Sequence, residues 1–358
     1  MIFAFLGTPA GTLEGATNFN SHSTATEAFT IGDFNGDGIP DIAVSGATSN
    51  NVSILLGDGK GNFRFKGSFA TGPCPVGVTA ADFNGDGKLD LAVVNFGLDN
   101  VSILLGNGDG TFGPAVNFGA GQLPMYAVAG DFNGDGHIDL AVTNFGGGNV
   151  SILLGNRDGT FGPPNFAAGR SPEYIAMADL NGDGKLDLAV GDSSAGTVLV
   201  LFGNGDGKCK TATALSTGGA NTSGIAIADF NGDGKPDIVA ADSATSKVTV
   251  LLGNGKGSFQ SAITSPVGNG LVSGPFALAT GDLNGDGKLD VAVVASSLQD
   301  VALLPGLGNG KFGTATFLGA DAAPAGIAAT QLRAGKLDDL VVVDSERNLV
   351  SVLRNTAK

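Results

Sequence analysis

The sequence predicts an all-β protein, a seven-bladed β-propeller of four-stranded antiparallel blades whose ring is closed by an N-terminal strand. Three observations support this prediction. A nine-residue acidic stretch occurs six times, starting at residues 33, 82, 131, 179, 229 and 282. Each repeat holds four short segments of strand length that are rich in β-branched and aromatic residues. Glycine accounts for 60 of the 358 residues, which suits a chain that turns every few residues.

The second repeat shows the four segments, which we name a to d in chain order. Segment a, residues 76–83, is built of small residues, and segment b, residues 89–95, is apolar on both faces. Segment c covers residues 101–106 and segment d residues 111–118. Segment d contains a proline, which cannot donate to a strand ladder, so d should form the outer edge. Small residues in a suit strands crowded around a shared axis, as in a propeller blade. A linear solenoid of stacked repeats is the alternative.

A seventh, degraded copy of the acidic stretch begins at Gln331 and keeps the hydrophobic spacing. Read as residues 331–338, it is one residue short. Segments of b and c type follow it, and no d segment comes after them. Residues 11–19 match a d segment, so we expect this stretch to supply the outer strand of the last blade and close the ring. Residues 3–7 resemble an additional c segment, whose role the sequence does not decide.

We therefore treat residues 1–358 as a single propeller domain. Its blades are expected at about residues 27–75, 76–124, 125–172, 173–222, 223–275, 276–324 and 325–358, with 11–19 completing the last.

Composition narrows the possible partners. The 34 acidic and 19 basic residues give a formal net charge of −15, and no basic stripe is visible, so nucleic acid is not an expected partner. No apolar run reaches the roughly 18–20 residues that cross a bilayer, so we expect no membrane insertion. Cys74 and Cys209 stand at non-equivalent positions and are expected to be free thiols. We expect a monomer, and we do not expect residues 1–7 to be a signal peptide.

The acidic stretch has the ligand spacing of a calcium loop. Oxygen-bearing side chains stand at positions 1, 3, 5 and 9 around two glycines, and the backbone carbonyl of position 7 is a further expected ligand. Calcium prefers six to eight oxygens, whereas magnesium demands a smaller octahedral shell. Because each stretch joins two strands, we expect a static clip and not a helix-opening sensor. The alternative is an Asx-turn that binds nothing.

We expect about six Ca²⁺ sites, one in each of blades 1 to 6. The ligand sets are Asp33, Asn35, Asp37, Ile39 and Asp41; Asp82, Asn84, Asp86, Lys88 and Asp90; Asp131, Asn133, Asp135, His137 and Asp139; Asp179, Asn181, Asp183, Lys185 and Asp187; Asp229, Asn231, Asp233, Lys235 and Asp237; and Asp282, Asn284, Asp286, Lys288 and Asp290. Ile39, Lys88, His137, Lys185, Lys235 and Lys288 act through the backbone carbonyl.

The seventh copy lacks the first two ligands. Gln331 and Arg333 stand at positions 1 and 3. We hypothesise that the Arg333 guanidinium occupies the vacant site and pairs with Asp338 or Asp339. The imidazole of His137 is expected to be solvated and not catalytic.

The two tyrosines of the chain mark a candidate ligand site. Each stands five residues before an acidic stretch, where the other repeats have alanine or glycine. Propeller geometry places a–b and c–d loops on one face and b–c and d–a loops on the other, so the tyrosines should lie opposite the acidic loops. The functional interpretation is a shallow site between blades three and four; the alternative is a packing tyrosine shared by two similar repeats. The candidate residues are Tyr126, Tyr174, Arg170, Glu173 and Gln122.

The stretch D-x-N-G-D-G-x-x-D, followed by L-A-V and by V-S-I-L-L-G-N-G-D-G-T-F-G, resembles the FG-GAP/VCBS repeat over about residues 11–354. The resemblance implies a calcium-binding propeller like that of integrin α chains and secreted bacterial proteins. It also implies an extracellular or cell-surface location.

Three kinds of function stay open. The first is a binding or adhesion module that engages a protein or glycan ligand through the b–c/d–a face. The second is a purely structural calcium-stabilised domain of a larger surface protein. The third is a polysaccharide-active enzyme or a lectin, which the absence of tryptophan disfavours for sugar stacking. We expect no enzyme, since His22 and His137 are the only histidines and no nucleophile elbow or phosphate loop is present.

Overall fold

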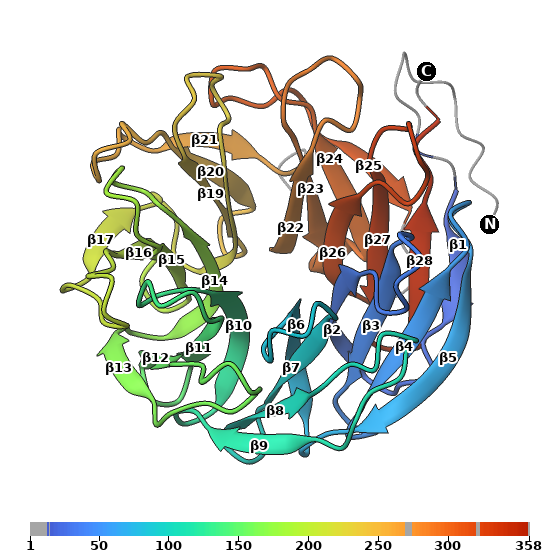
Figure 1. Ribbon diagram of the computed structural model, residues 1–358. Helices are drawn as coiled ribbons and strands as arrows, with labels where there is room; N and C mark the ends of the chain where they lie inside the picture. Colours follow the sequence, from blue (N-terminus) through green and yellow to red (C-terminus); the bar gives the residue numbers. More distant parts are fainter. Residues whose placement is uncertain (1–12, 14, 269–273, 320–322, 357–358) are drawn as a thin grey trace.

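The computed structural model describes residues 13, 15–268, 274–319 and 323–356. Within these residues, seven four-stranded sheets are arranged around a central axis (Figure 1). Every pair of neighbouring strands within a sheet is antiparallel. The prediction of an all-β seven-bladed propeller is confirmed. In the described part of the chain, no helix is long and apolar enough to cross a membrane.

The blades follow one another along the chain. Blade 1 consists of β2 (Thr26–Gly32), β3 (Asp41–Gly46), β4 (Asn51–Gly57) and β5 (Phe63–Ala70). Blade 2 consists of β6 (Pro75–Ala81), β7 (Asp90–Asn95), β8 (Asn100–Leu104) and β9 (Val116–Gly119). Blade 3 consists of β10 (Pro124–Gly130), β11 (Asp139–Asn144), β12 (Asn149–Leu153) and β13 (Asn165–Ala168). Blade 4 consists of β14 (Pro172–Ala178), β15 (Asp187–Asp192), β16 (Thr197–Leu201) and β17 (Thr213–Ser216).

The remaining three blades have the same order. Blade 5 consists of β18 (Thr222–Ala228), β19 (Asp237–Asp242), β20 (Lys247–Leu251) and β21 (Ile263–Pro266). Blade 6 consists of β22 (Pro275–Gly281), β23 (Asp290–Ala295), β24 (Asp300–Leu304) and β25 (Thr316–Gly319), with the short 3-10 turn η1 (Ser296–Leu298) between its middle strands. Blade 7 consists of β26 (Pro324–Thr330), β27 (Asp339–Asp344), β28 (Leu349–Leu353) and β1 (Thr17–Asn20).

The N-terminal strand closes the ring, as predicted. β1 pairs with β28, with Thr17 opposite Val352 and Asn20 opposite Leu349. An isolated bridge joins Leu13 to Asn355 beyond the strand. Closure matters because an unpaired β28 would present an open edge to solvent. The possible extra segment at residues 3–7 lies outside the described residues.

The outer strands occupy the edges of the blades, as the proline in segment d predicted. The strand is shorter than expected, however. In blade 2, Phe112 makes only an isolated bridge with Gly106, and β9 begins at Val116. Pro114 lies between them, but the same interruption occurs in blades 4, 5 and 6, which have no proline there, so the proline is not its cause.

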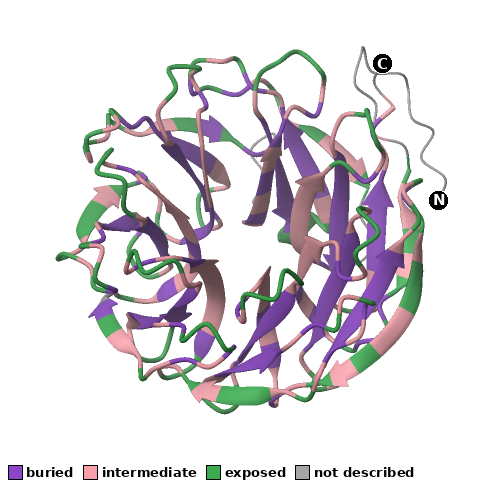
Figure 2. Ribbon diagram, viewed as in Figure 1, coloured by how far each residue is buried: buried purple, intermediate pink, exposed green. Residues whose placement is uncertain are grey.

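The hydrophobic core is divided into seven clusters, each between two neighbouring blades. Figure 2 shows the middle strands of the blades largely buried and the outer strands partly exposed. The side chain at position 2 of every acidic loop is buried in one of these clusters, so each loop is attached to the core. These side chains are Phe34, Phe83, Phe132, Leu180, Phe230, Leu283 and, in the seventh copy, Leu332.

Candidate functional site

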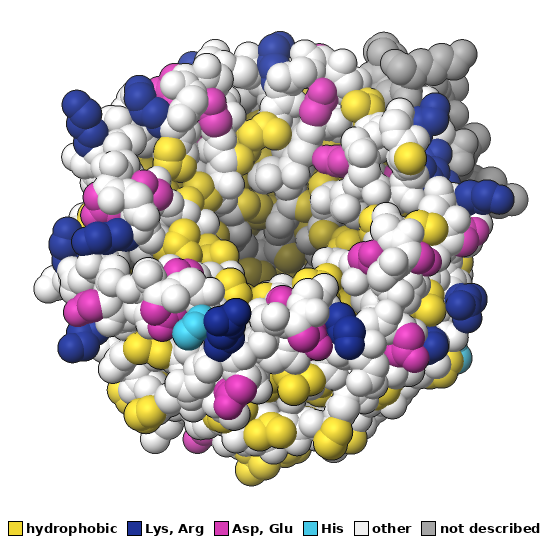
Figure 3. Space-filling model, viewed as in Figure 1, with side chains coloured by type: hydrophobic (Ala, Val, Ile, Leu, Met, Phe, Trp, Pro, Cys, Tyr) yellow, Lys and Arg dark blue, Asp and Glu magenta, His cyan; other side chains and the backbone are white. Residues whose placement is uncertain are grey.

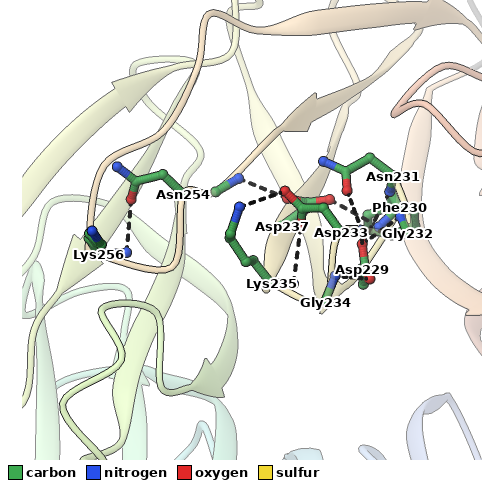
Figure 4. A network of polar contacts seen from close by, with 11 residues as sticks. Asp229, Phe230, Asn231, Gly232, Asp233, Gly234, Lys235, Asp237, Asn254 and Lys256 are labelled. Carbon is green, nitrogen blue, oxygen red and sulfur yellow. Dashed lines mark hydrogen bonds and ion pairs between the residues drawn. The ribbon is translucent and has the colours of Figure 1, made fainter.

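The acidic loop between β18 and β19 represents the six copies (Figure 4). Asp229 Oδ1 accepts hydrogen bonds from the N–H groups of Gly232, at 2.8 Å, and Asp233, at 3.1 Å, while its Oδ2 accepts one from Gly234 at 2.7 Å. Asn231 Oδ1 accepts a bond from the N–H of Asp233 at 2.8 Å. The φ angles of Gly232 and Gly234 are 75° and 77°, a conformation that glycine adopts at little cost. The chain therefore wraps around the carboxylate at position 1.

The aspartate at position 9 joins the loop to the end of the third strand of the same blade. Asp237 is fully buried, its Oδ2 accepts from the N–H of Phe230 at 3.0 Å, and its Oδ1 accepts from the N–H of Gly253 at 2.8 Å. Burial raises the pKa of Asp237 to about 6, the two backbone bonds oppose this, and the nearby charges of Asp233 and Asp229 raise it further. A cation among these carboxylates would favour their charged forms.

The same arrangement occurs in all six loops. The buried aspartates at position 9 are Asp41, Asp90, Asp139, Asp187, Asp237 and Asp290, each with the same two backbone donors. The pKa of each is raised, chiefly by burial.

In the loops of blades 3 and 5, the side chain at position 7 lies beside the aspartate at position 5 of the same loop. Lys235 Nζ lies 3.0 Å from Asp233 Oδ2, and His137 Nδ1 lies 3.4 Å from Asp135 Oδ1. The His137 side chain is 30% exposed, so the ring that was expected to be solvated is only partly exposed. These side chains leave the backbone carbonyl as the only ligand that position 7 could offer to an ion.

The donor set of each loop fits calcium chemically, since it consists of carboxylate, amide and carbonyl oxygens. Among the residues that the structure describes, no three His, Cys, Asp or Glu side chains lie close enough together to hold a metal ion. The loop oxygens are held by N–H groups, yet a carboxylate has about four lone-pair sites, so these bonds leave room for an ion. Calcium binding by the six loops stays a prediction.

In the seventh loop a guanidinium stands beside the buried aspartate. Arg333 Nη2 lies 2.6 Å from Asp339 Oδ1, and Arg333 Nε lies 3.2 Å from Asp339 Oδ2. Arg333 Nη2 also donates to the carbonyl oxygen of Asn355 at 2.6 Å. The hypothesis that Arg333 pairs with an aspartate of this loop is therefore confirmed, and the partner is Asp339.

The reading of the seventh stretch as one residue short is wrong. Asp339 opens β27 just as Asp237 opens β19, and Asp339 Oδ1 accepts from the N–H of Asn355 at 2.7 Å. Asp339 therefore holds position 9, and Asp338 holds position 8. Two adjacent aspartates made the alignment ambiguous until the start of the strand was known.

A set of glycines that the sequence reasoning missed supports the six loops. The N–H of Gly106 donates to Asp90 Oδ1 at 2.7 Å, and a Cβ on Gly106 would lie 2.1 Å from the carbonyl oxygen of Leu89. Only glycine permits this approach of the backbone. The sequence signal that could have identified them is the glycine that ends segment c in six repeats. These glycines are Gly57, Gly106, Gly155, Gly203, Gly253 and Gly306.

The two tyrosines of the candidate ligand site lie in contact. The hydroxyl of Tyr126 donates to the hydroxyl of Tyr174 at 3.0 Å, and the stacked rings have centroids 4.2 Å apart. Burial raises the pKa of both hydroxyl groups well above the ordinary value. The register of β10 and β11 shifts between Pro124 and Ala127, so Tyr126 lies in a bulge of the inner strand.

The other members of the predicted site are less closely associated. Glu173 is half-buried and adjoins Tyr174, whereas Arg170 and Gln122 are exposed. No ion pair joins Arg170 to Glu173 in the described structure. The sequence reasoning missed Phe276, whose ring lies 5.4 Å from that of Tyr174 in an edge-on arrangement.

The protein is thus a seven-bladed propeller. In six blades the two inner strands are joined by an acidic loop, and in the seventh the corresponding loop holds the guanidinium of Arg333. The chain belongs to the FG-GAP-like repeat family, whose model matches residues 33–93, 84–142, 131–190, 179–240 and 229–293. No curated protein matches the chain.

Solved structures share the fold. A lectin of Agrocybe aegerita that recognises non-reducing terminal N-acetylglucosamine is 25% identical, with 83% of this chain and 81% of that chain covered and a TM-score of 0.60. BBS1N in complex with ARL6DN is 11% identical over 98% of both chains, with a TM-score of 0.67. Virginiamycin B lyase from Staphylococcus aureus is 12% identical over 95% of this chain and 99% of that chain, with a TM-score of 0.63.

Proposed function

We propose that this chain is a calcium-stabilised propeller that serves as an extracellular or cell-surface interaction module. Its ligand, a protein or a glycan, would bind the face formed by the b–c and d–a loops. The role is non-catalytic, the chain acts as a monomer, and neither nucleic acid nor membrane insertion is involved. Membership in the FG-GAP-like repeat family supports an interaction role.

The seventh blade carries the calcium part of the proposal. Six blades place three aspartates in each loop, and the blade that lacks two of them has a guanidinium within 2.6 Å of the position 9 carboxylate. A buried carboxylate is stable when a positive charge pairs with it. Bound calcium would supply that charge in the other six blades and connect each a–b loop to its hairpin.

Metal content and binding assays test the two parts separately. Protein stripped with EDTA and titrated with CaCl₂ in a calorimeter should bind six ions per chain. If the calorimeter detects no heat of binding and EDTA does not change the melting curve, the proposal that the loops bind calcium is wrong. Immobilised protein should capture a partner from the surface or secreted fraction of its source cells. Failure of both this pull-down and a glycan array would leave the purely structural alternative.

Glycan recognition is the second candidate. The 25% identity to the Agrocybe aegerita lectin favours it. A surface hollow of about 450 Å³ between blades 1 and 2 is lined by aromatic and polar side chains, including Phe69, Phe112, Ser68 and Asn117. A glycan array that contains terminal N-acetylglucosamine tests this candidate, with Phe69→Ala as the variant that should lose any signal.

A residual enzymatic alternative has a direct test. Incubation with a panel of acidic and neutral polysaccharides should release neither reducing ends nor unsaturated products. If the purified protein releases reducing ends or unsaturated products with repeated turnover, the proposal of a non-catalytic role is wrong.

A further inference from the structure

The only two tyrosines of the chain form a stacked pair between blades 3 and 4. Tyr126 belongs to β10 and Tyr174 to β14, which are the innermost strands of these blades. The ring planes differ by 23°, the ring centroids lie 4.2 Å apart, and the hydroxyl of Tyr126 donates to that of Tyr174 at 3.0 Å. The rings therefore lie face to face with their hydroxyl groups side by side.

This geometry aligns the carbon atoms through which two phenols couple. In a phenoxyl radical the unpaired electron is shared by the oxygen, the two ortho carbons and the para carbon, and the para carbon of tyrosine already carries the side-chain methylene. Each ortho carbon is bonded to the carbon that carries the hydroxyl, so contact between the hydroxyls brings ortho carbons of both rings close together. Groups held in this way react far more readily than groups that must first meet in solution.

Phe276 provides a contrast at the same place in the ring. Its ring centroid lies 5.4 Å from that of Tyr174, but the two planes meet at 84°, so it presents an edge and not a face. Both arrangements are ordinary for packed aromatic rings. Only the arrangement of Tyr126 and Tyr174 places two rings in the overlap that carbon–carbon coupling needs.

The pair is neither fully buried nor fully exposed. Figure 3 shows that the centre of the propeller, around which the inner strands stand, is hollow and lined largely by hydrophobic side chains. Burial raises the pKa of both hydroxyl groups well above the ordinary value, so both are neutral phenols at neutral pH. Each ring therefore loses a proton together with its electron when it is oxidised.

The two cysteines compete weakly for an oxidant. Cys74 and Cys209 are both free. Burial raises the pKa of both thiols, to about 11 for Cys209, and nearby carboxylates raise it further. Cysteine is oxidised as the thiolate, of which little is present at neutral pH. Because neither cysteine forms a disulfide, no disulfide joins two blades in the part of the chain that the structure describes.

We propose that Tyr126 and Tyr174 are a site of oxidative modification, at which a one-electron oxidant joins the two rings as dityrosine. Each phenol gives one electron to the oxidant and one proton to water, and the two radicals pair to form a single bond between ortho carbons. The hydrogen on each of these carbons then passes through water to the oxygen of the same ring, which restores both aromatic rings and both hydroxyl groups. The chain loses two hydrogen atoms, and two equivalents of oxidant are reduced.

The new bond would connect the inner strands of two neighbouring blades. The tyrosines are 48 positions apart in the chain. A cross-link that closes a loop of this length restricts the unfolded chain, and for a chain of this size it should raise the melting temperature by about 5 °C. The inference goes beyond the proposed interaction function and needs neither calcium nor a ligand.

Stoichiometric oxidation followed by mass spectrometry tests the proposal. Two equivalents of tris(bipyridine)ruthenium(III), a one-electron oxidant, are added to dilute protein. The chain should lose the mass of two hydrogen atoms and gain the blue emission of dityrosine. Trypsin cuts after lysine and arginine, so peptides 89–157 and 171–185, each with one tyrosine, should stay joined. The joined peptides should survive dithiothreitol, which distinguishes the bond from a disulfide.

Variants separate stacking from proximity. Tyr126→Phe keeps a ring, removes one phenol and should give no joined peptides. Tyr126→Phe combined with Phe276→Tyr restores two tyrosines with the second ring edge-on to Tyr174, and it should give far less dityrosine than the parent protein. The parent protein unfolded in guanidinium chloride should also give little. A variant is scored only if its melting temperature stays near that of the parent.

Four results would overturn the proposal. They are the absence of joined peptides in the parent protein, an equal yield in the unfolded chain, an equal yield in the double variant, and cross-links that form only between separate chains. A purified cross-linked protein that melts no higher than the parent would show that coupling distorts the native contact, which also contradicts the inference. Calcium binding and partner capture are measured separately, so failure here leaves the proposed function standing.

Discussion

Replacement of Arg333 by methionine removes the only internal cation of the seventh loop and leaves Asp339 buried without its partner. Asp339 is fully buried, and the Arg333 side chain is 22% exposed. Breaking a buried pair from one side costs about 3–5 kcal/mol, because the remaining charge is uncompensated. The arginine also donates to the Asn355 carbonyl at 2.6 Å, a contact that fixes the chain just beyond β28. We therefore expect the upper part of this range.

The expected shift in melting temperature follows from the size of the chain. Unfolding entropy of roughly 2.1 cal/mol/K per residue gives about 0.75 kcal/mol/K for 358 residues, so a loss of about 4–5 kcal/mol should lower the melting temperature of the variant by about 5–7 °C. Differential scanning calorimetry with saturating calcium measures this loss. Arg64→Met is the control, since Arg64 is an exposed residue of β5. An unchanged melting temperature for Arg333→Met, or equal shifts for both variants, would refute the reasoning.

A loop exchange tests whether the guanidinium takes the place of an ion. Residues 331–338 can be replaced by residues 282–289, which are equal in number and lead into an aspartate at position 9 in the same way. The exchanged protein should bind one calcium ion more than the parent and should lose more stability in EDTA. If it binds no additional ion, the seventh loop is not equivalent to the other six.

Three further predictions concern calcium, the loop glycines and the tyrosines. At a Kd of about 10⁻⁴ M and about 1 mM calcium, each site contributes roughly 1.4 kcal/mol, so EDTA should remove about 8 kcal/mol and lower the melting temperature by about 10 °C. Gly106→Ala places a Cβ 2.1 Å from the Leu89 carbonyl oxygen and should cost about 1–3 kcal/mol or more in thermal unfolding. Gly119→Ala, which meets nothing within 4 Å, should be neutral. Because burial raises the pKa of Tyr126 and Tyr174, their stabilisation is present below about pH 10 and is lost as the pH rises further. Ultraviolet titration of the folded protein should therefore show no tyrosinate at about pH 11, where exposed tyrosine is ionised.

The repeat made the blades predictable from the sequence. Because the same contacts recur every 48 to 53 residues, the buried side chain at position 2, the edge strand and the closing strand could each be read from one repeat and carried to the next. The loops were predictable for the same reason, since the spacing of their oxygens is local. The supporting glycine at the end of segment c was equally visible and was missed only because it carries no side chain.

The candidate ligand site was only half predictable. Tyr126 and Tyr174 stood out because they break the repeat at matching positions. Phe276 did not, because its contact with Tyr174 depends on which inner strands come together around the axis of the ring. That meeting joins blades that are not neighbours, and no spacing along the chain reports it. A Cβ on Gly224 would lie 2.6 Å from the carbonyl oxygen of Phe276, so the backbones of blades 5 and 6 approach closely at this position.

The pairing of β1 with β28 has a consequence for the order of folding. Six blades are each formed by one continuous segment, whereas the seventh joins strands that are more than three hundred residues apart in the chain. Contacts between such distant segments form slowly, so this blade should be completed last, and until then β28 offers an open edge to other chains. The ion pair between Arg333 and Asp339 in this blade forms without any metal from solution. The slowest step of assembly can therefore finish in a compartment poor in calcium, and the other six loops can bind their ions afterwards.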